Sequence, residues 1–177
     1  MTFTLEELKN TIKVFSSHQC DFLTDNCIVA LELNNHKTGS KMQIMGDQED
    51  EVLLLWSTKV ETAGYKEQKK ITEHAAEAIS FFLAKELTEY SVIEEATIGT
   101  GFDYWLGFHS AHSKYDPLNF LSARLEISGI LKETSHNSVE ARVRDKKDQT
   151  KPTDYLKLPA YISIIEFSKP KAYFALK

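Results

Sequence analysis

The order of helices and strands predicted for residues 64–177 constrains the fold more than any single segment does. The predicted elements are a helix, three strands, a second helix and two strands, at residues 66–88, 90–98, 101–108, 123–131, 137–150, 158–168 and 171–177. Strands joined by short turns pair antiparallel, whereas strands separated by a helix can pair in parallel. This order therefore predicts an α/β fold, bordering on α+β, with a mixed central sheet flanked by helices.

Hydrophobic periodicity supports these assignments. The clearest helix, residues 66–88, carries one continuous apolar stripe that excludes Glu73 and Glu77. The long apolar segment 158–168 is typical of a central strand. Residues 171–177 are expected to form a closing edge strand.

The first third of the chain predicts a smaller unit of a helix and antiparallel strands. The helix is expected over residues 5–15, where apolar residues recur at helical spacing. Apolar runs separated by turn residues predict strands at residues 27–33, 41–46 and 51–57. One compact protein is therefore expected, in which residues 1–63 pack as a small α+β extension on a core of residues 64–177.

The distribution of charge limits the kinds of partner. The chain has 177 residues and a net charge of -5. Residues 1–63 hold 5 Lys and Arg against 10 Asp and Glu, which gives -5, and residues 64–177 are balanced at 16 of each. Proteins that track nucleic acid over most of their surface are usually basic. Any contact with DNA or RNA is therefore expected to depend on a local patch.

The sequence also predicts where the protein resides. No segment approaches the roughly 18 consecutive apolar residues of a membrane-spanning helix, and the opening residues lack the pattern of a secretory signal. The two cysteines, Cys20 and Cys27, are then expected to be free thiols in a reducing compartment. A cytoplasmic protein with no membrane partner is predicted.

Two acids on consecutive predicted strands form the best candidate site. Asp103 and Glu126 each lie in an otherwise apolar strand, on the face opposite the aliphatic residues. If the two strands pair as a hairpin, both carboxylates reach one place. Carboxylate oxygens are the ligands that Mg²⁺ prefers, and Mg²⁺ can activate water for attack on a phosphodiester. The alternative is a solvated sheet face, on which Arg124 and Glu126 form a surface ion pair of little energetic value.

The element order together with this acid pair resembles the PD-(D/E)XK nuclease-like superfamily over about residues 68–168. The resemblance implies a restriction-endonuclease-like core and a Mg²⁺-dependent phosphodiesterase acting on DNA or RNA. It gives metal-binding roles to Asp103 and Glu126, and places the family's helical acid at Glu77 or, less favourably, at Glu73. A second resemblance, to segments of uncharacterised bacterial proteins, involves the stretches GTGFDYWLGF, ARLEISGI and LPAYISIIEFSKP. This second resemblance implies no function.

This chain departs from the family pattern at the lysine that steadies the attacking water. The residue two after Glu126 is Ser128. A cation elsewhere could replace the lysine, and Lys146, Arg124 and Lys114 are the candidates. The predicted catalytic set therefore consists of Asp103, Glu126, Ser128 and Lys146. The site is expected to be inactive if no cation replaces the lysine.

Other groups of polar residues give weaker signals. The set His18, Cys20, Cys27 and His36 has zinc-ligand chemistry but matches no four-ligand spacing, and His109, His112 and Asp116 share one predicted loop. A basic run on the second helix is either a phosphate-binding face or a solvated surface. The run consists of Arg142, Arg144, Lys146, Lys147 and Lys151.

Two functions follow from the sequence. The first is a PD-(D/E)XK-like phosphodiesterase whose partner is DNA or RNA. The alternative is a non-catalytic module that binds another protein, such as an acidic accessory subunit, an immunity protein or a component of a defence system. The acidic first third and the missing lysine favour the alternative.

Overall fold

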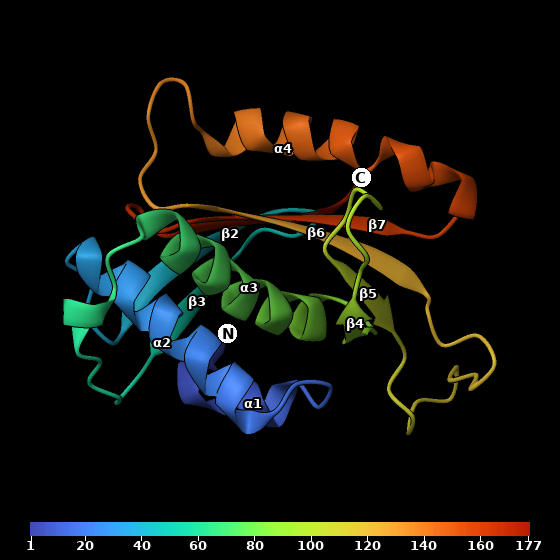
Figure 1. Cartoon of the computed structure of the whole chain (residues 1–177), viewed down its shortest axis with the longest axis horizontal. Coiled ribbons are helices and arrows are strands. Elements are labelled where there is room, and N and C mark those ends of the chain that lie inside the picture. Colours follow the sequence, from blue (N-terminus) through green and yellow to red (C-terminus); the bar gives the residue numbers. More distant parts are fainter.

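The computed structural model describes residues 1–177, and its eight strands form one mixed sheet (Figure 1). The strand order is β1-β3-β2-β8-β7-β6-β5-β4. The strands are β1 (Thr2–Thr4), β2 (Ser40–Gly46), β3 (Asp50–Leu55), β4 (Ser91–Glu95), β5 (Tyr104–Gly107), β6 (Ala123–Ile130), β7 (Ala160–Glu166) and β8 (Lys171–Leu176). The predicted mixed central sheet is confirmed.

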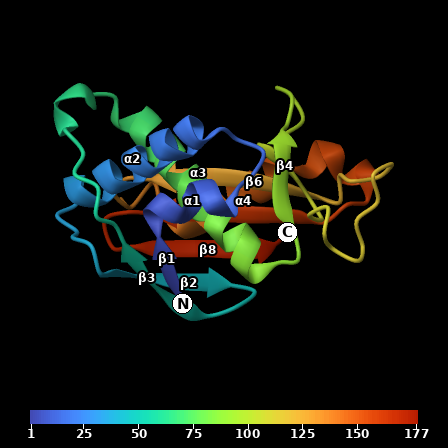
Figure 2. The ribbon, with the colours of Figure 1, turned by 90° about the horizontal axis from the view of Figure 1, so that it is seen from below.

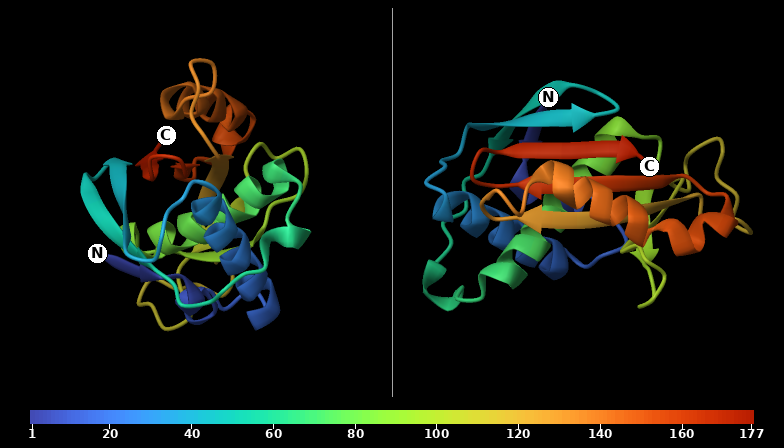
Figure 3. Two further views of the ribbon diagram at one scale, coloured as in Figure 1. Left: turned by 90° about the vertical axis from the view of Figure 1, so that its left-hand side faces the viewer. Right: turned by 90° about the horizontal axis from the view of Figure 1, so that it is seen from above.

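Helices cover both faces of this sheet. The α-helices are α1 (Leu8–Thr11), α2 (Ser17–Leu33), α3 (Gln68–Leu87) and α4 (Val139–Gln149), and short 3₁₀ helices are η1 (Leu5–Glu7), η2 (Thr62–Gly64) and η3 (Lys151–Leu156). Figures 1 and 3 show α1, α2 and α3 together on one face and α4 alone on the other. The flanking helices predicted from the sequence are thus present. No helix combines the length and the apolar character needed to cross a membrane.

The core is divided by the sheet into two unequal parts. The larger part lies under α2 and α3, where the aromatic rings of Phe3 and Phe82 stack with centroids 4.9 Å apart. The smaller part lies under α4 and consists of Ile130, Val139, Ile162 and Ile164. Both faces of β6 and β7 are therefore covered, which explains why β7 is almost entirely apolar.

The first 63 residues add strands to the same sheet. β2 pairs in parallel with β8, β3 pairs antiparallel with β2, and β1 pairs in parallel with β3. Figure 2 shows β1, β2 and β3 side by side at one edge of the sheet, next to β8. The extension and the predicted core thus share a backbone hydrogen-bond network.

Two sequence-based assignments in the first third are wrong. The strand predicted over residues 27–33 is instead the last half of α2, which starts after Ser16 with a reciprocal cap between Ser16 and Gln19. A short apolar run does not distinguish a buried helix from a strand. The helix expected over residues 5–15 is confined to η1 and α1, because the chain is already extended at Ile12.

Two strand assignments in the last third also need correction. β8 is an interior strand and not the closing edge, because β2 pairs with its free side. The strand expected over residues 101–108 is only four residues long. Gly101 has a φ of +80°, and its missing Cβ leaves room for the carbonyl oxygen of Gln149, so the chain turns there instead of extending.

Candidate functional site

A polar cleft of about 590 Å³ opens where β6 loses its neighbour. β5 pairs only with Ala123–Leu125 of β6, so no strand covers the edge of β6 beyond that point. The first turns of α3 form one wall of the cleft and α4 forms the other. Gly129 lets α3 approach closely, because a Cβ at this position would lie 2.4 Å from the carbonyl oxygen of Thr72.

Asp103 lines this cleft, and Glu126, the other acid of the predicted pair, is buried beside it. The register that pairs Tyr104 with Leu125 places Asp103 opposite Glu126 in the antiparallel hairpin. One carboxylate oxygen of Asp103, Oδ2, accepts a hydrogen bond of 2.7 Å from the backbone N–H of Ile127. The hairpin condition derived from the sequence is therefore met.

The environment of Glu126 makes its ionisation unfavourable. Glu126 has no exposed surface, whereas Asp103 is exposed and lines the cleft. Burial, reinforced by the neighbouring Asp103 carboxylate, raises the pKa of Glu126 to about 7. Partial desolvation of its carboxyl group also raises the pKa of Asp103. A buried carboxyl group whose negative charge is opposed by a neighbouring carboxylate favours a shared proton or a shared cation.

Lys146 supplies the positive charge that the Ser128 position lacks. Its ammonium group donates a hydrogen bond to Oε1 of Glu126 from the opposite wall, α4. Gln149, one turn further on, donates to the same oxygen at 2.9 Å and accepts from Lys146 Nζ at 3.0 Å. Glu126 Oε2 is buried and has no partner.

The other two cations proposed from the sequence lie elsewhere. Arg124 is buried on β6 but bonds to Thr153 and to the carbonyl oxygen of Leu158, not to Glu126. The surface ion pair between Arg124 and Glu126 is therefore wrong, because α4 and η3 cover that face of the sheet. Lys114 pairs with Glu89 at 2.5 Å.

The third acid comes from α3. Glu77 is half-buried in the cleft wall, 3.4 Å from Nδ1 of His74, and hydrogen-bonds to Tyr104. Burial raises its pKa, and the Asp103 carboxylate adds to this effect. Glu73 is more exposed and pairs with Lys69. Both helical acids named from the sequence line the cleft, and Glu77 is the less exposed of the two.

The residues present fit a partly hydrated cation better than a fully protein-coordinated one. No three His, Cys, Asp or Glu side chains meet as a ready-made cluster of ligands. Glu126 Oε2 nevertheless has no hydrogen-bond donor in the protein, and the Asp103 carboxyl group lies within hydrogen-bonding reach of Glu126. Mg²⁺ commonly uses one or two carboxylates and keeps several waters. Ser128 lines the same cleft.

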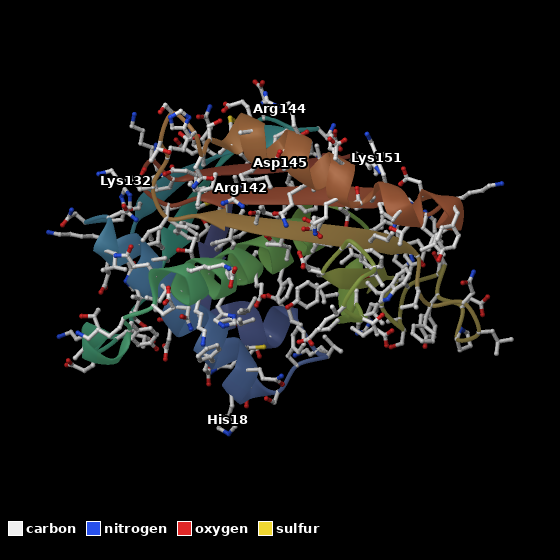
Figure 4. All side chains as sticks on the ribbon, turned by 45° about the horizontal axis from the view of Figure 1, so that its top comes forward. His18, Lys132, Arg142, Arg144, Asp145 and Lys151 are labelled. Carbon is white, nitrogen blue, oxygen red and sulfur yellow. The ribbon has the colours of Figure 1, made fainter.

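The weaker candidates do not form sites. Cys20 and Cys27 are buried within α2, and Figure 4 shows His18 at the far end of the molecule from α4. Burial raises the pKa of the Cys27 thiol, which makes it a poor ligand and nucleophile. His36 contacts the carbonyl oxygen of Ser168 at 3.2 Å.

The loop histidines are likewise held by local contacts. His112 stacks on Phe108 with centroids 4.7 Å apart, and His109 accepts a hydrogen bond from the Ala111 N–H. Asp116 accepts a hydrogen bond from the backbone of Leu118. These contacts account for the polar groups of the loop without a ligand.

The basic run of α4 is divided between the cleft and the surface. Arg142 and Lys146 line the cleft, and Figure 4 shows Arg142 over β6 with Arg144 on the other side of the helix. Lys151 pairs with Asp148 at 2.6 Å. Part of the run therefore faces the cleft, and part of it is solvated surface; phosphate binding by the first part stays a prediction.

Sequence reasoning missed Gln149 and His74. Gln149 follows Lys146 by three residues, so both lie on one helix face, and that spacing was the only signal available.

Comparisons of the chain with family models, with curated proteins and with solved structures find no match in any of the three.

Proposed function

We propose that the protein is a PD-(D/E)XK-like, metal-dependent phosphodiesterase that hydrolyses nucleic acid. The observation that carries this proposal is the buried, unpartnered Oε2 of Glu126 next to Asp103, while Lys146 and Gln149 occupy Oε1. A buried polar atom without a partner is costly. A divalent cation shared with Asp103 would remove that cost.

The proposed roles follow from the contacts. Asp103 and Glu126 would hold the cation, and Glu77, which lines the same cleft as Asp103, would bind one of the cation's waters. A bound Mg²⁺ supplies a more acidic water and neutralises charge on the phosphate. Lys146 lies on the α4 side, where its ammonium group can donate to the attacking water or to a phosphate oxygen. Ser128 lines the floor of the same cleft.

The reaction balances as a hydrolysis. A new P–O bond forms to the water oxygen, and the bond from phosphorus to the leaving sugar oxygen breaks. One proton leaves the water, and the sugar oxygen takes up one proton.

Arg142 lines the cleft wall above β6, where its guanidinium group can bind a phosphate oxygen.

A cleavage assay tests the proposal. The wild type and Asp103→Asn are incubated with single- and double-stranded DNA and RNA, in Mg²⁺, Mn²⁺ or EDTA. Asparagine still accepts the hydrogen bond from Ile127 but loses the charge, so the hairpin should persist while cleavage falls at least about 100-fold. Asp116→Asn, in a distant loop, is the matched control and should cleave like the wild type.

Lys146→Met separates catalysis from metal binding. This variant should lose cleavage while retaining affinity for the cation, because Asp103 and Glu126 remain. If the wild type cleaves no substrate with either metal, or if Asp103→Asn cleaves as well as the wild type, the proposal is wrong. A stable stoichiometric complex with another protein would then favour the non-catalytic module.

A further inference from the structure

A separate hollow adjoins the cleft on each side of the acid pair, and the two hollows differ in the charges that line them. On one side, the cleft continues along β6 into a second hollow of about 440 Å³, and the two share Gln68 and Leu131. On the other side lies a hollow of about 350 Å³ that shares Glu77 and Asp103 with the cleft. A strand bound at the acid pair therefore meets different chemistry in each direction.

The side along β6 suits a phosphate backbone. Lys69 and Arg142 line the cleft, and Lys132 and Lys169 line the second hollow. Asn137 Oδ1 accepts a 2.8 Å hydrogen bond from Arg142 Nε, which leaves the outer nitrogens of the guanidinium group available. Figure 4 shows Lys132 near one end of the molecule, further along than Arg142.

These cations are available for a ligand. Lys132, Lys169 and Arg142 form no ion pair, and Lys69 has only an exposed contact of 3.8 Å with Glu73. The neighbouring Lys171, by contrast, is paired with Glu133 at 2.6 Å. The N-terminus of α3 adds nothing to this potential, because the Glu67 carboxylate caps it by accepting the N–H of Lys69 at 3.2 Å. The attraction for phosphate therefore comes from the side-chain cations alone.

The opposite side repels a phosphate backbone. The hollow there is lined by Glu77, Glu95 and Asp103 and by no lysine or arginine. Its outer wall is the β4–β5 turn, from Ala96 to Phe102. Past the acid pair and its cation, a continuing phosphate would face the Glu95 carboxylate with no lysine or arginine nearby.

We infer that the protein acts at the ends of nucleic acid strands, with the strand held along β6 and its terminus at the acidic hollow. This inference rests on the proposed function and adds the position of the cut. The path from Glu126 to Lys132 is about 20 Å long at roughly 3.3 Å per residue. It spans up to about six stacked nucleotides at roughly 3.4 Å each.

Linear and circular substrates of one sequence provide the test. Single-stranded DNA and RNA are prepared in both forms and incubated with the wild type and Mg²⁺ or Mn²⁺. Linear strands should be shortened from an end, and circles should stay intact under the same conditions. Cleavage of circles at the rate of linear strands would overturn the strand-end inference and leave the phosphodiesterase intact. Failure to cleave either form would overturn both.

A charge variant tests the path of the strand. Lys132→Gln/Lys169→Gln should weaken binding of linear strands, and the slope of log affinity against log salt should fall by about 0.7 for each phosphate that is no longer neutralised. Hydrolysis of bis(p-nitrophenyl) phosphate, which is too small to reach these lysines, should not change. Lys59→Gln/Lys85→Gln removes the same charge elsewhere and is the control. Equal slopes in the two double variants would contradict the path.

Discussion

Glu6 joins the start of the chain to the segment that follows β3. Its Oε1 accepts hydrogen bonds from the backbone N–H and the hydroxyl of both Ser57 and Thr58, at 2.7 to 3.1 Å. Burial alone would raise the pKa of Glu6, but these donors outweigh it and lower the pKa to about 2. The carboxylate form therefore stabilises the folded chain.

The pH dependence of stability follows from that shift. In the unfolded chain the pKa of Glu6 returns to about 4.5, so its contribution is complete above that pH and is lost as the pH falls towards 2. Glu6→Gln should lower the free energy of unfolding by about 1–2 kcal/mol at pH 7. Urea unfolding of both proteins at pH 7 and at pH 2.5 should show a smaller difference at the lower pH. An equal difference at both would contradict the assignment.

Residue-scale prediction of the site succeeded where adjacent strands determine the geometry. Asp103 and Glu126 could be placed together because a hairpin between consecutive strands is a local event. Lys146 was included in the predicted catalytic set, but the sequence could not show that it contacts Glu126, since this depends on where α4 crosses β6. Gln149 was missed for the same reason.

At the scale of elements, the cap of α2 shows why the assignment of residues 27–33 failed. The Ser16 hydroxyl accepts a hydrogen bond from the Gln19 N–H, and the Gln19 side chain accepts one from the Ser16 N–H. Two donors of the first turn are thereby satisfied, which starts a helix of 17 residues. The apolar run CIVALEL then belongs to a helix buried against α3.

Removing this cap has a measurable cost. Ser16→Ala should reduce the free energy of unfolding by about 1 kcal/mol. Ser17→Ala changes the first residue of the helix proper, where the hydroxyl forms no cap, and should change stability by less than half as much. Thermal or urea unfolding followed by circular dichroism measures both. Equal losses in the two variants would show that the cap contributes nothing specific.

The segments with clear periodicity were predicted well. The helices at 66–88 and 137–150 correspond to α3 and α4, and the strand at 123–131 corresponds to β6. Their patterns are local, so one sequence suffices to recognise them. The position of β8 depends on the distant pairing with β2, which leaves no mark in its own residues.

At the scale of the whole molecule, one sheet runs from the first strand to the last. β2 lies in parallel beside β8, and the backbone N–H of Leu53 donates to the carbonyl oxygen of Met1. The core under α2 and α3 includes residues from both parts of the chain. The two parts therefore stabilise one another.

This continuity predicts a single unfolding transition. Urea curves recorded by tryptophan fluorescence and by circular dichroism should coincide, since Trp56 and Trp105 report on different ends of the sheet. A fragment of residues 64–177 should lack cooperative unfolding, because it exposes one edge of β8 and the face of α3 that packs on α2. Separate transitions, or a stable fragment, would contradict this account.

Calorimetric titration with Mn²⁺ tests the claim that Asp103 and Glu126 share a divalent cation. The wild type should bind one ion per chain at this site. Asp103→Asn should lose that binding while keeping the wild-type circular dichroism spectrum, and Asp116→Asn should retain it. Equal binding by the wild type and Asp103→Asn, or no binding by the wild type, would contradict the claim.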